Sequence, residues 1–314
     1  MARYRAAVIG LGRIGFTMEA DTRRPKPATH VGAWLACPRA KLAAVCDVDH
    51  GKVAAALDLG QVDDNDPVPL VGYTDLAWLL KDTFGIVSIA TPPDIHRVIV
   101  EQCAAAGVKA VVCEKPLALS ARDCRAMVAA CKESGTRLFV NHSRRFDPVL
   151  RLAASEAPRR LGEITAVVGH YSGDLWESGP HILDLARMMT HQEIGSVLGF
   201  SEKAAVIELG PAPLILVVHD AADYAIFELH VYGRKGALLV TDSGYTVAWQ
   251  DAVDHPYFTG YRGLGPRWYA QGFARSFLAP MAEHVCDVLD GKAEPVSTGE
   301  DGLAVVRVLE ALNP

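Results

Sequence analysis

The feature that most constrains the fold of this chain is a glycine-rich turn after its first apolar run. Ala6 to Ile9 is apolar, and Gly10, Gly12 and Gly15 follow at the spacing G-x-G-x-x-G. The first glycine permits a tight turn, the second lets a pyrophosphate approach the backbone, and the third lets a helix pack closely on the strand. The N-terminal N–H groups of that helix would face the phosphates. The spacing predicts a dinucleotide-binding turn, with an ordinary strand–turn–helix corner as the alternative. Two side chains within the turn are further candidate cofactor contacts: Arg13 and Ile14.

An acidic residue ends the second expected strand. Lys41 to Cys46 is predicted as a strand, and Asp47 follows it. In a dinucleotide-binding fold such a carboxylate binds the adenosine ribose hydroxyls. The distance from the glycines exceeds the usual spacing of about 20 residues, and a proline-bearing loop at 16–29 accounts for the excess, with a helix resuming at Thr29 as N-cap. Asp47 predicts NAD as cofactor, whereas Arg13 can neutralise it or hold the 2′-phosphate of NADP.

The first half of the chain alternates between short apolar runs and helical segments, with a loop at Asp63–Pro69 after the helix Lys52–Leu59. Apolar strands separated by helices are typical of a parallel sheet covered on both faces, with right-handed crossovers. We therefore expect a Rossmann-type doubly wound domain over residues 1–142. The expected strands are Phe84–Ile89, Val108–Cys113 and Arg137–Val140, and the expected helices are Lys52–Leu59, Thr74–Leu80, Pro93–Ala106 and Ser120–Ser134.

The pattern of apolar and polar residues changes after residue 142. Alternating side chains along Tyr224–Tyr232, with turn glycines after it, favour an antiparallel sheet. We expect an α+β domain over 143–314, with an open, mainly antiparallel sheet and helices on one face. Its expected strands are Ile164–His170, Val197–Glu202, Leu214–His219, Ala222–Tyr232, Ala237–Thr241 and Thr246–Gln250, and its expected helices are Ser178–Met189, Gln271–Leu289 and one that begins at Thr298. The uncovered sheet face predicts a homodimer or homotetramer.

Composition excludes several classes of protein. The chain has 314 residues, enough for two domains, and its formal net charge of -6 argues against a nucleic-acid-binding protein. No apolar run is long enough to cross a membrane, and the N-terminus lacks the apolar core of a signal peptide. The seven cysteines form no C-x-x-C pair, which predicts reduced thiols and a cytoplasmic location.

Two candidate site segments end buried strands of the first half. Thr91 and Pro92 follow the strand that ends at Ile89, with His96 a few residues later, where strand ends line a cofactor crevice. Glu114 and Lys115 follow Cys113, and a charged pair at the mouth of a buried strand costs desolvation energy. A lysine near a cationic nicotinamide has its pKa lowered and can hold or deprotonate a substrate hydroxyl. The alternatives are a rigid turn in the first segment and a surface lysine in the second.

A third candidate lies in the second half. Glu177, His181 and Asp184 are spaced so that the histidine and the later carboxylate share a helix face. A carboxylate orients an imidazole and raises its pKa toward neutrality, as a general base requires. A helix-capping histidine is the alternative. The sequence has no accompanying pattern of metal ligands, so we predict no metal site.

These residues together resemble the glucose–fructose oxidoreductase, inositol dehydrogenase and rhizopine-catabolism (Gfo/Idh/MocA) family over nearly the whole chain. The carriers are Val8–Gly15, Cys46–Asp49, Ala90–Pro93 with His96, Cys113–Pro116, Asn141–Pro148, Leu161–Ile164 and Gly179–Leu185. The resemblance implies a nicotinamide cofactor, a catalytic lysine at Lys115 followed by a cis bond to Pro116, and a catalytic histidine at His181. Family members often carry an aspartate at the position of Glu177, and this difference leaves the role of Glu177 open.

The predicted function is that of an NAD(P)-dependent dehydrogenase or reductase that acts on a secondary alcohol of a sugar, cyclitol or sugar derivative. Two alternatives remain open: an NAD-dependent enzyme of the same family that cleaves glycosides, and a dinucleotide-binding sensor without turnover. The substrate itself is not predicted. Three residues are candidates for reading it: Arg144, Arg145 and Tyr171.

Overall fold

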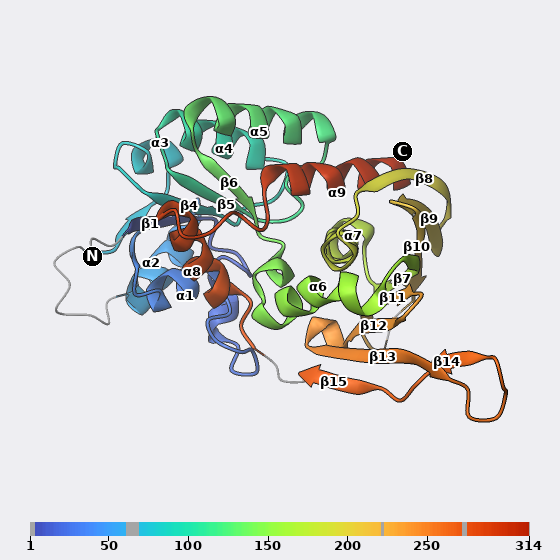
Figure 1. Cartoon of the computed structure of the whole chain (residues 1–314). Coiled ribbons are helices and arrows are strands. Elements are labelled where there is room, and N and C mark those ends of the chain that lie inside the picture. Colours follow the sequence, from blue (N-terminus) through green and yellow to red (C-terminus); the bar gives the residue numbers. More distant parts are fainter. Residues whose placement is uncertain (1–3, 61–68, 221–222, 272–274, 314) are drawn as a thin grey trace. The chain divides into compact units, whose positions relative to one another are not determined.

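The computed structural model describes residues 4–60, 69–220, 223–271 and 275–313, which form two compact units. The first unit comprises Met1–Phe146 with Arg275–Leu303, and the second comprises Asp147–Ala274 with Ala304–Pro314. The first boundary thus lies four residues later than the expected 142/143 border, and the last part of the chain is divided between the two units. Figure 1 shows the helices and strands of both units, coloured by sequence from blue at the N-terminus to red at the C-terminus. The expected loop at Asp63–Pro69 lies almost entirely outside the described residues.

A six-stranded parallel sheet of order β3-β2-β1-β4-β5-β6 forms the first unit. This confirms the predicted Rossmann-type fold. Its strands are β1 (Tyr4–Ile9), β2 (Ala40–Cys46), β3 (Val71–Tyr73), β4 (Ile86–Ile89), β5 (Ala110–Cys113) and β6 (Arg137–Val140). Its helices are η1 (Thr17–Ala20), α1 (His30–Ala36), α2 (His50–Gly60), α3 (Leu76–Leu79), α4 (His96–Ala105), α5 (Ala121–Ser134), η2 (Ser143–Phe146) and α8 (Leu278–Leu289). Asp75, not the expected Thr74, caps α3, because its carboxylate accepts the Ala77 N–H.

The register of the parallel strands brings the candidate segments to one edge of the sheet. Ile9 pairs with Cys46 on one side and Ile89 on the other, and Cys113 pairs with Ile89 and Val140. Because parallel strands end on the same side, the segments that follow these five positions lie at one carboxyl edge. The glycine turn, Asp47, Thr91, Glu114 and Asn141 therefore line the same edge.

The loop predicted at 16–29 separates a first helical turn from helix α1, and backbone hydrogen bonds still join the two parts. The chain makes one helical turn after the glycines and then leaves it through η1. It returns so that His30 N–H donates to Ile14 O and Val31 N–H donates to Gly15 O, both at 3.0 Å. Thr29 caps α1 as predicted, since its hydroxyl accepts the Gly32 N–H. The excess spacing between the glycines and Asp47 is thus a true insertion.

Helix α8 packs in the core of the first unit although it follows the second unit in sequence. Leu278, Met281 and Val285 are buried in one cluster with Trp34 and Phe139. This apolar face explains why the last part of the chain returns to the first unit. The helix begins at Leu278, whereas the sequence predicted a start at residue 271; residues 272–274 lie outside the described part of the chain.

The second unit is built on a mixed, mainly antiparallel sheet of order β14-β13-β12-β11-β7-β10-β9-β8, with β15 beside β13. Only β7 and β10 pair in parallel among the described strands of this sheet. The strands are β7 (Ile164–Ser172), β8 (Ile194–Ser201), β9 (Ala204–Leu209), β10 (Ala212–His219), β11 (Phe227–Gly233), β12 (Gly236–Thr241), β13 (Thr246–Asp254), β14 (Arg262–Leu264) and β15 (Trp268–Gln271). The sequence did not predict β9, β14 or β15, and β11 begins later than expected. The short 3-10 turn η3 (Asp242–Gly244) connects β12 and β13.

Helices cover one face of this sheet, as predicted. They are α6 (Pro148–Leu161), α7 (Leu175–Thr190) and the C-terminal part of α9 (Gly299–Leu312), and their apolar faces share one core with Val167, Leu214, Leu229 and Leu238 (Figure 1). Helix α6 was not predicted, although Asp147 caps it and Pro148 occupies its first turn, which is a common start signal. The other face carries a row of paired residues from neighbouring strands: Val206, Ile215, Val168, His230, Leu239 and Ala248.

Two whole-chain expectations concern cysteines and membranes. All seven cysteines are buried free thiols, as predicted. Within the described residues, no helix combines the length and apolar character that crossing a bilayer requires.

Candidate functional site

The glycine turn of the first unit has the geometry that a bound phosphate requires. Gly10 has a φ of +90°, and a side chain there would meet Ala90 C at 2.6 Å and Thr91 N at 2.7 Å. A Cβ on Gly15 would overlap the carbonyl oxygen of Gly10. Gly12 differs, because a Cβ there would have no heavy atom within 4 Å. Two glycines are thus required by packing, and the third leaves open space beside the backbone.

Asp47 is joined directly to this turn. Its Oδ2 accepts the Leu11 N–H at 2.7 Å, its Oδ1 accepts the Asp49 N–H at 2.9 Å, and its side chain is mostly buried. The Lys52 ammonium on α2 lies 3.9 Å from Oδ1. Sequence reasoning missed Lys52, although its place in the first turn of the helix after Asp47 is a signal for it. Arg13 is exposed.

The segment after β4 supplies a polar atom without a partner. Thr91 Oγ1 is buried and has no hydrogen-bond partner among the described residues. Such a hydroxyl costs free energy unless a ligand satisfies it. Together with the open position at Gly12, it shows that this edge of the sheet fits a dinucleotide. Pro92 follows Thr91 in the turn before α4.

His96 is fully buried and lies between two loops rather than in open space. Its Nε2 is 2.9 Å from Thr91 O and its Nδ1 is 3.1 Å from Leu117 O. Burial lowers the pKa of His96, and the two carbonyl contacts oppose that shift. The side chain therefore joins the loops after β4 and β5. The role of His96 in cofactor binding stays a prediction. Its contacts favour an indirect role, in which the side chain holds the loops that carry Thr91 and Leu117 in place.

Glu114 is the centre of a buried polar cluster that sequence reasoning did not anticipate. Its Oε1 lies 2.9 Å from His30 Nε2 and accepts Asn141 Nδ2–H at 2.6 Å, and its Oε2 accepts the Lys115 N–H at 3.2 Å. The same imidazole reaches Ser88 Oγ. His30 and Ser88 are far from Glu114 in sequence, so no local pattern indicates the cluster. Lys115 is partly exposed, and its bond to Pro116 is cis, as the resemblance implies.

Helix α7 carries the three candidates of the second unit. Asp174 is its N-cap, accepting the Trp176 and Glu177 N–H groups, so the helix begins earlier than predicted. His181 therefore lies within the helix, and the capping alternative for it is wrong. Its ring is partly exposed and meets the Phe227 ring edge-on, with centroids 6.3 Å apart.

The two carboxylates on this helix have different environments. Glu177 is exposed and lies one turn before His181, whereas Asp184 is 2% exposed. Asp184 Oδ1 lies 3.9 Å from Arg187 Nη1, and Arg187 in turn holds Glu193 at 2.7 Å. The carboxylate with access to solvent is thus Glu177. The roles of both carboxylates stay predictions.

Arg144, Arg145 and Tyr171, the candidates for substrate recognition, each contact other parts of the protein. Arg145 lies in the first unit, where it donates to Val296 O at 3.0 Å and pairs with Asp301 at 3.1 Å. Arg144, in the same unit, lies over the Phe277 ring. Tyr171 is 2% exposed in the core of the second unit, and burial raises its pKa. These contacts give Arg145 and Tyr171 partners within the protein, and their part in reading the substrate stays a prediction.

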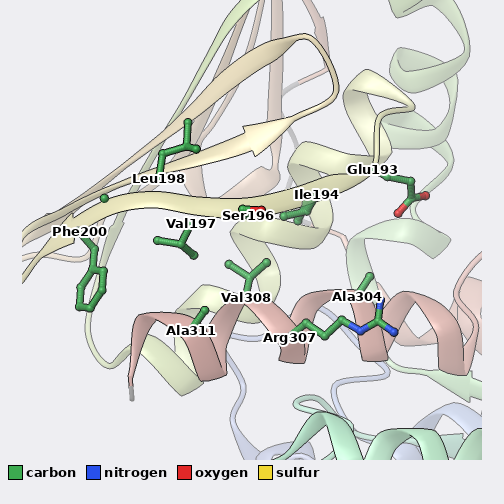
Figure 2. A pocket seen from close by; sticks show the side chains of 12 residues that line it. Glu193, Ile194, Ser196, Val197, Leu198, Phe200, Ala304, Arg307, Val308 and Ala311 are labelled. Atoms are coloured by element: carbon green, nitrogen blue, oxygen red, sulfur yellow. The ribbon is translucent and has the colours of Figure 1, made fainter.

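A groove in the second unit contains none of the predicted residues. Strand β8 and helix α9 line it, with Val197, Val308 and Ala304 directed inward and Arg307 at its side (Figure 2). Its volume is about 830 Å³. In the described part of the chain, no three His, Cys, Asp or Glu side chains are arranged to hold a metal ion.

The structure thus brings one set of predicted residues together in each unit. The glycines, Asp47, Thr91, Glu114 and Lys115 share the carboxyl edge of the first sheet. The second set, Glu177, His181 and Asp184, shares α7.

Known proteins with similar sequences and folds point to one class. Residues 4–142 match the family described as "Oxidoreductase family, NAD-binding Rossmann fold". An inositol 2-dehydrogenase of Salmonella typhimurium is 31% identical over 74% of this chain and 72% of its own length. A D-apiose dehydrogenase of Paraburkholderia graminis is 25% identical over 98% of this chain and 86% of its own length. The WlbA dehydrogenase of Bordetella pertussis, solved with NADH and UDP-GlcNAcA, shares the fold with a TM-score of 0.75 at 22% identity, over 99% of this chain and 94% of that one.

Proposed function

Since the chain belongs to the Gfo/Idh/MocA family of oxidoreductases, we propose that it transfers a hydride between a nicotinamide cofactor and a secondary alcohol of a sugar, cyclitol or sugar derivative. One observation carries the proposal. The open position at Gly12 and the unpartnered Thr91 hydroxyl lie at the same sheet edge as Lys115. The inositol and apiose dehydrogenases among the relatives support the substrate class. The buried free thiols support a cytoplasmic location.

The bound cofactor would be held by the glycine turn, Asp47 and Thr91, and it would supply the hydride acceptor or donor. Lys115 holds the substrate oxygen and stabilises the negative charge that develops on it. His181 takes the hydroxyl proton, and the exposed Glu177 on the preceding turn of α7 orients the imidazole. We assign Asp184 a supporting place in the same helix. General base catalysis of this kind contributes roughly a hundred- to ten-thousandfold in rate.

Thermal unfolding with NAD, NADP and a panel of polyols and sugars tests this function. A ligand that binds only the folded protein raises the unfolding temperature by mass action. We expect a nicotinamide cofactor and at least one polyol or sugar to stabilise the protein, and that pair to give net cofactor reduction. Cleavage of a glycoside without net reduction would favour the glycosidase alternative. Tight NADH binding without turnover across the panel would favour a sensor.

The cofactor preference is a separate proposal: Asp47 selects NAD. The 2′-phosphate of NADP would meet the Asp47 carboxylate, and two like charges about 4 Å apart cost on the order of 4 kcal/mol at an effective dielectric of 20. Retaining a third of that cost gives about tenfold weaker binding. We therefore expect titration of the wild-type protein to show NAD binding about tenfold more tightly than NADP.

Substitution of Asp47 separates charge from structure. Asp47→Asn removes the charge and keeps one of the two oxygens that accept the Leu11 and Asp49 N–H groups, so one of these two hydrogen bonds is lost. A folded Asp47→Asn protein should show a smaller difference between NAD and NADP affinity than the wild type. Lys52→Met, which removes the ammonium near Asp47, should weaken NADP more than NAD. Tighter NADP than NAD binding by the wild type would show that Arg13 and Lys52 dominate this site.

We also propose that the chain forms a homodimer or homotetramer through the uncovered sheet face of the second unit. The row Val206, Ile215, Val168, His230, Leu239 and Ala248 is apolar except for one histidine. Val206 is exposed and Ile215 and Val168 are partly exposed, whereas Leu239 and Ala248 are already buried within the unit. His170, whose ring lies 5.5 Å from that of His230, adds a further polar group beside the row. The exposed apolar part of the row fits a two-fold, self-complementary contact.

Ile215→Lys should dissociate the oligomer, because it places an ammonium within that row. Light scattering at micromolar protein concentration measures the mass. Ser196→Lys is the matched control, since Ser196 is exposed on β8 and lines the groove beside α9; this variant should keep the wild-type mass. A monomeric wild-type protein would contradict the proposal.

A further inference from the structure

Five side chains form a continuous buried polar chain beneath the Lys115 segment. Trp34 Nε1–H donates to Ser88 Oγ at 2.8 Å, and Ser88 Oγ lies 3.2 Å from His30 Nδ1. His30 Nε2 lies 2.9 Å from Glu114 Oε1, which also accepts from Asn141 Nδ2. Trp34, His30 and Ser88 have no exposed area, and the other two are at most 7% exposed. The chain joins α1, β4 and the ends of β5 and β6.

Counting donors and acceptors fixes where the protons lie. Trp34 Nε1 can only donate, so Ser88 Oγ accepts that bond and has its own hydrogen left to donate. Among the described residues, that hydrogen has a partner only if His30 Nδ1 accepts it, so the arrangement that satisfies every donor makes Nδ1 an acceptor. The imidazole proton therefore lies on Nε2 and is donated to Glu114. In this arrangement the ring is neutral, and Glu114 keeps a full negative charge.

The surroundings of Glu114 stabilise that charge. Burial raises the pKa of Glu114, but its interactions with His30 first of all, and then with Asn141 and Lys115, outweigh that effect, so the pKa lies below its usual value. Two other titratable groups interact with this carboxylate. Burial, and then the charge of Glu114, raise the pKa of the Cys113 thiol, and burial lowers the pKa of His96. These shifts disfavour the thiolate of Cys113 and the imidazolium form of His96.

We propose that this buried chain is a positioning system for Lys115: Glu114 holds the Lys115 backbone N–H and keeps the side chain as an ammonium ion, while His30 and Ser88 hold Glu114. The inference rests on the proposed function and refines it. An ammonium ion cannot act as a base, so Lys115 binds and polarises the substrate oxygen, and proton removal falls to His181. A nearby opposite charge shifts a pKa by about 1 to 3 units, which is the size of effect expected here.

Chemical labelling of Lys115 tests this without relying on turnover. Only the free amine reacts with acetic anhydride, so the pH dependence of Lys115 acetylation, followed by peptide mass spectrometry, gives the midpoint of its ionisation. Glu114→Gln keeps the side-chain volume and removes the charge. We expect the midpoint to fall by about one pH unit or more. Glu101→Gln, the same change on α4 beside Arg97, should leave it unchanged.

The outcomes separate this inference from the proposed function. An unchanged midpoint in a folded Glu114→Gln protein would overturn it. A lowered midpoint in a protein that oxidises no polyol would support the positioning system and reject the dehydrogenase. Where activity exists, the basic limb of the pH–rate profile should move with the labelling midpoint, which a purely structural role of Glu114 would not cause.

A second measurement covers the case in which Glu114→Gln does not fold. The ¹⁵N chemical shifts of His30 in the wild-type protein report which ring nitrogens carry protons. We expect a proton on Nε2 alone. A doubly protonated ring would cancel the charge of Glu114 and overturn the proposal. Ser88→Ala should lower kcat while cofactor affinity stays within a few-fold, since it loosens His30 and leaves the charge of Glu114 in place.

Discussion

Lys115→Ala should reduce turnover to the detection limit while cofactor affinity stays within a few-fold of the wild type. Lys115 follows a buried strand at the edge that carries the glycine turn, and the substrate oxygen develops negative charge as its proton leaves. Without the ammonium group, that charge is left to water, and the loss should reach roughly a thousandfold or more in kcat. Steady-state kinetics together with NAD titration measure the two quantities separately.

A matched control distinguishes this role from loss of structure. Lys109, which precedes β5, is exposed, and Lys109→Ala should behave as the wild type. Near-normal turnover in a purified, folded Lys115→Ala protein would remove Lys115 from the mechanism.

His181→Asn should lower kcat by roughly a hundredfold or more with the fold intact. The ring is partly exposed within α7, and the helix is capped by Asp174 rather than by His181. Replacing the imidazole therefore removes a base without removing a cap. The acidic limb of the pH–rate profile, which reports protonation of this base, should disappear in the variant, and the unfolding temperature should change little.

His191→Asn is the comparison for this variant. His191 follows the same helix, where its Nε2 lies 2.8 Å from the Ala154 carbonyl oxygen, so its loss should affect stability and leave the pH–rate profile unchanged. A His181→Asn protein that keeps the wild-type profile would show that another group takes the proton.

The two substitutions together test whether Lys115 and His181 serve one chemical step. Groups that act as a unit are strongly non-additive, so the double variant should be about as slow as the slower single variant. Rate losses that multiply would indicate separate steps.

Local patterns were enough to predict five of the six strands of the first unit's sheet, whereas β3 and the place of α8 in this unit were not predicted. The glycine spacing, the apolar strands and the capping threonine at Thr29 all act over short stretches of chain, and the structure confirms them. Helix α6 was also within reach, because Asp147 and Pro148 form a recognisable helix start. Strand β9 lacks a comparable signal, since the turn before it, at Glu202 and Lys203, contains neither glycine nor proline.

Long-range packing set the limit of prediction. The apolar face of α8 indicates a buried helix, but nothing in its sequence tells which core it joins. The polar chain at Glu114 depends on His30 and Ser88, which approach it only once the parallel strands are aligned. Glu114 and Lys115 were recognised from their place at a strand end, whereas the residues that hold them could be found only in three dimensions.

The insertion at residues 16–29 has a consequence for how such chains can diversify. Its two ends are held at helical spacing by the bonds from His30 and Val31 to Ile14 and Gly15, and Glu19 and Lys26 close the loop on itself. Because these bonds fix the distance between the two ends of the segment, a longer loop costs only the additional entropy of closing it. Doubling the length of a flexible loop raises that free-energy cost by only about 0.6 kcal/mol. Evolution can therefore lengthen, shorten or exchange this segment beside the glycine turn while the sheet and the turn itself stay unchanged.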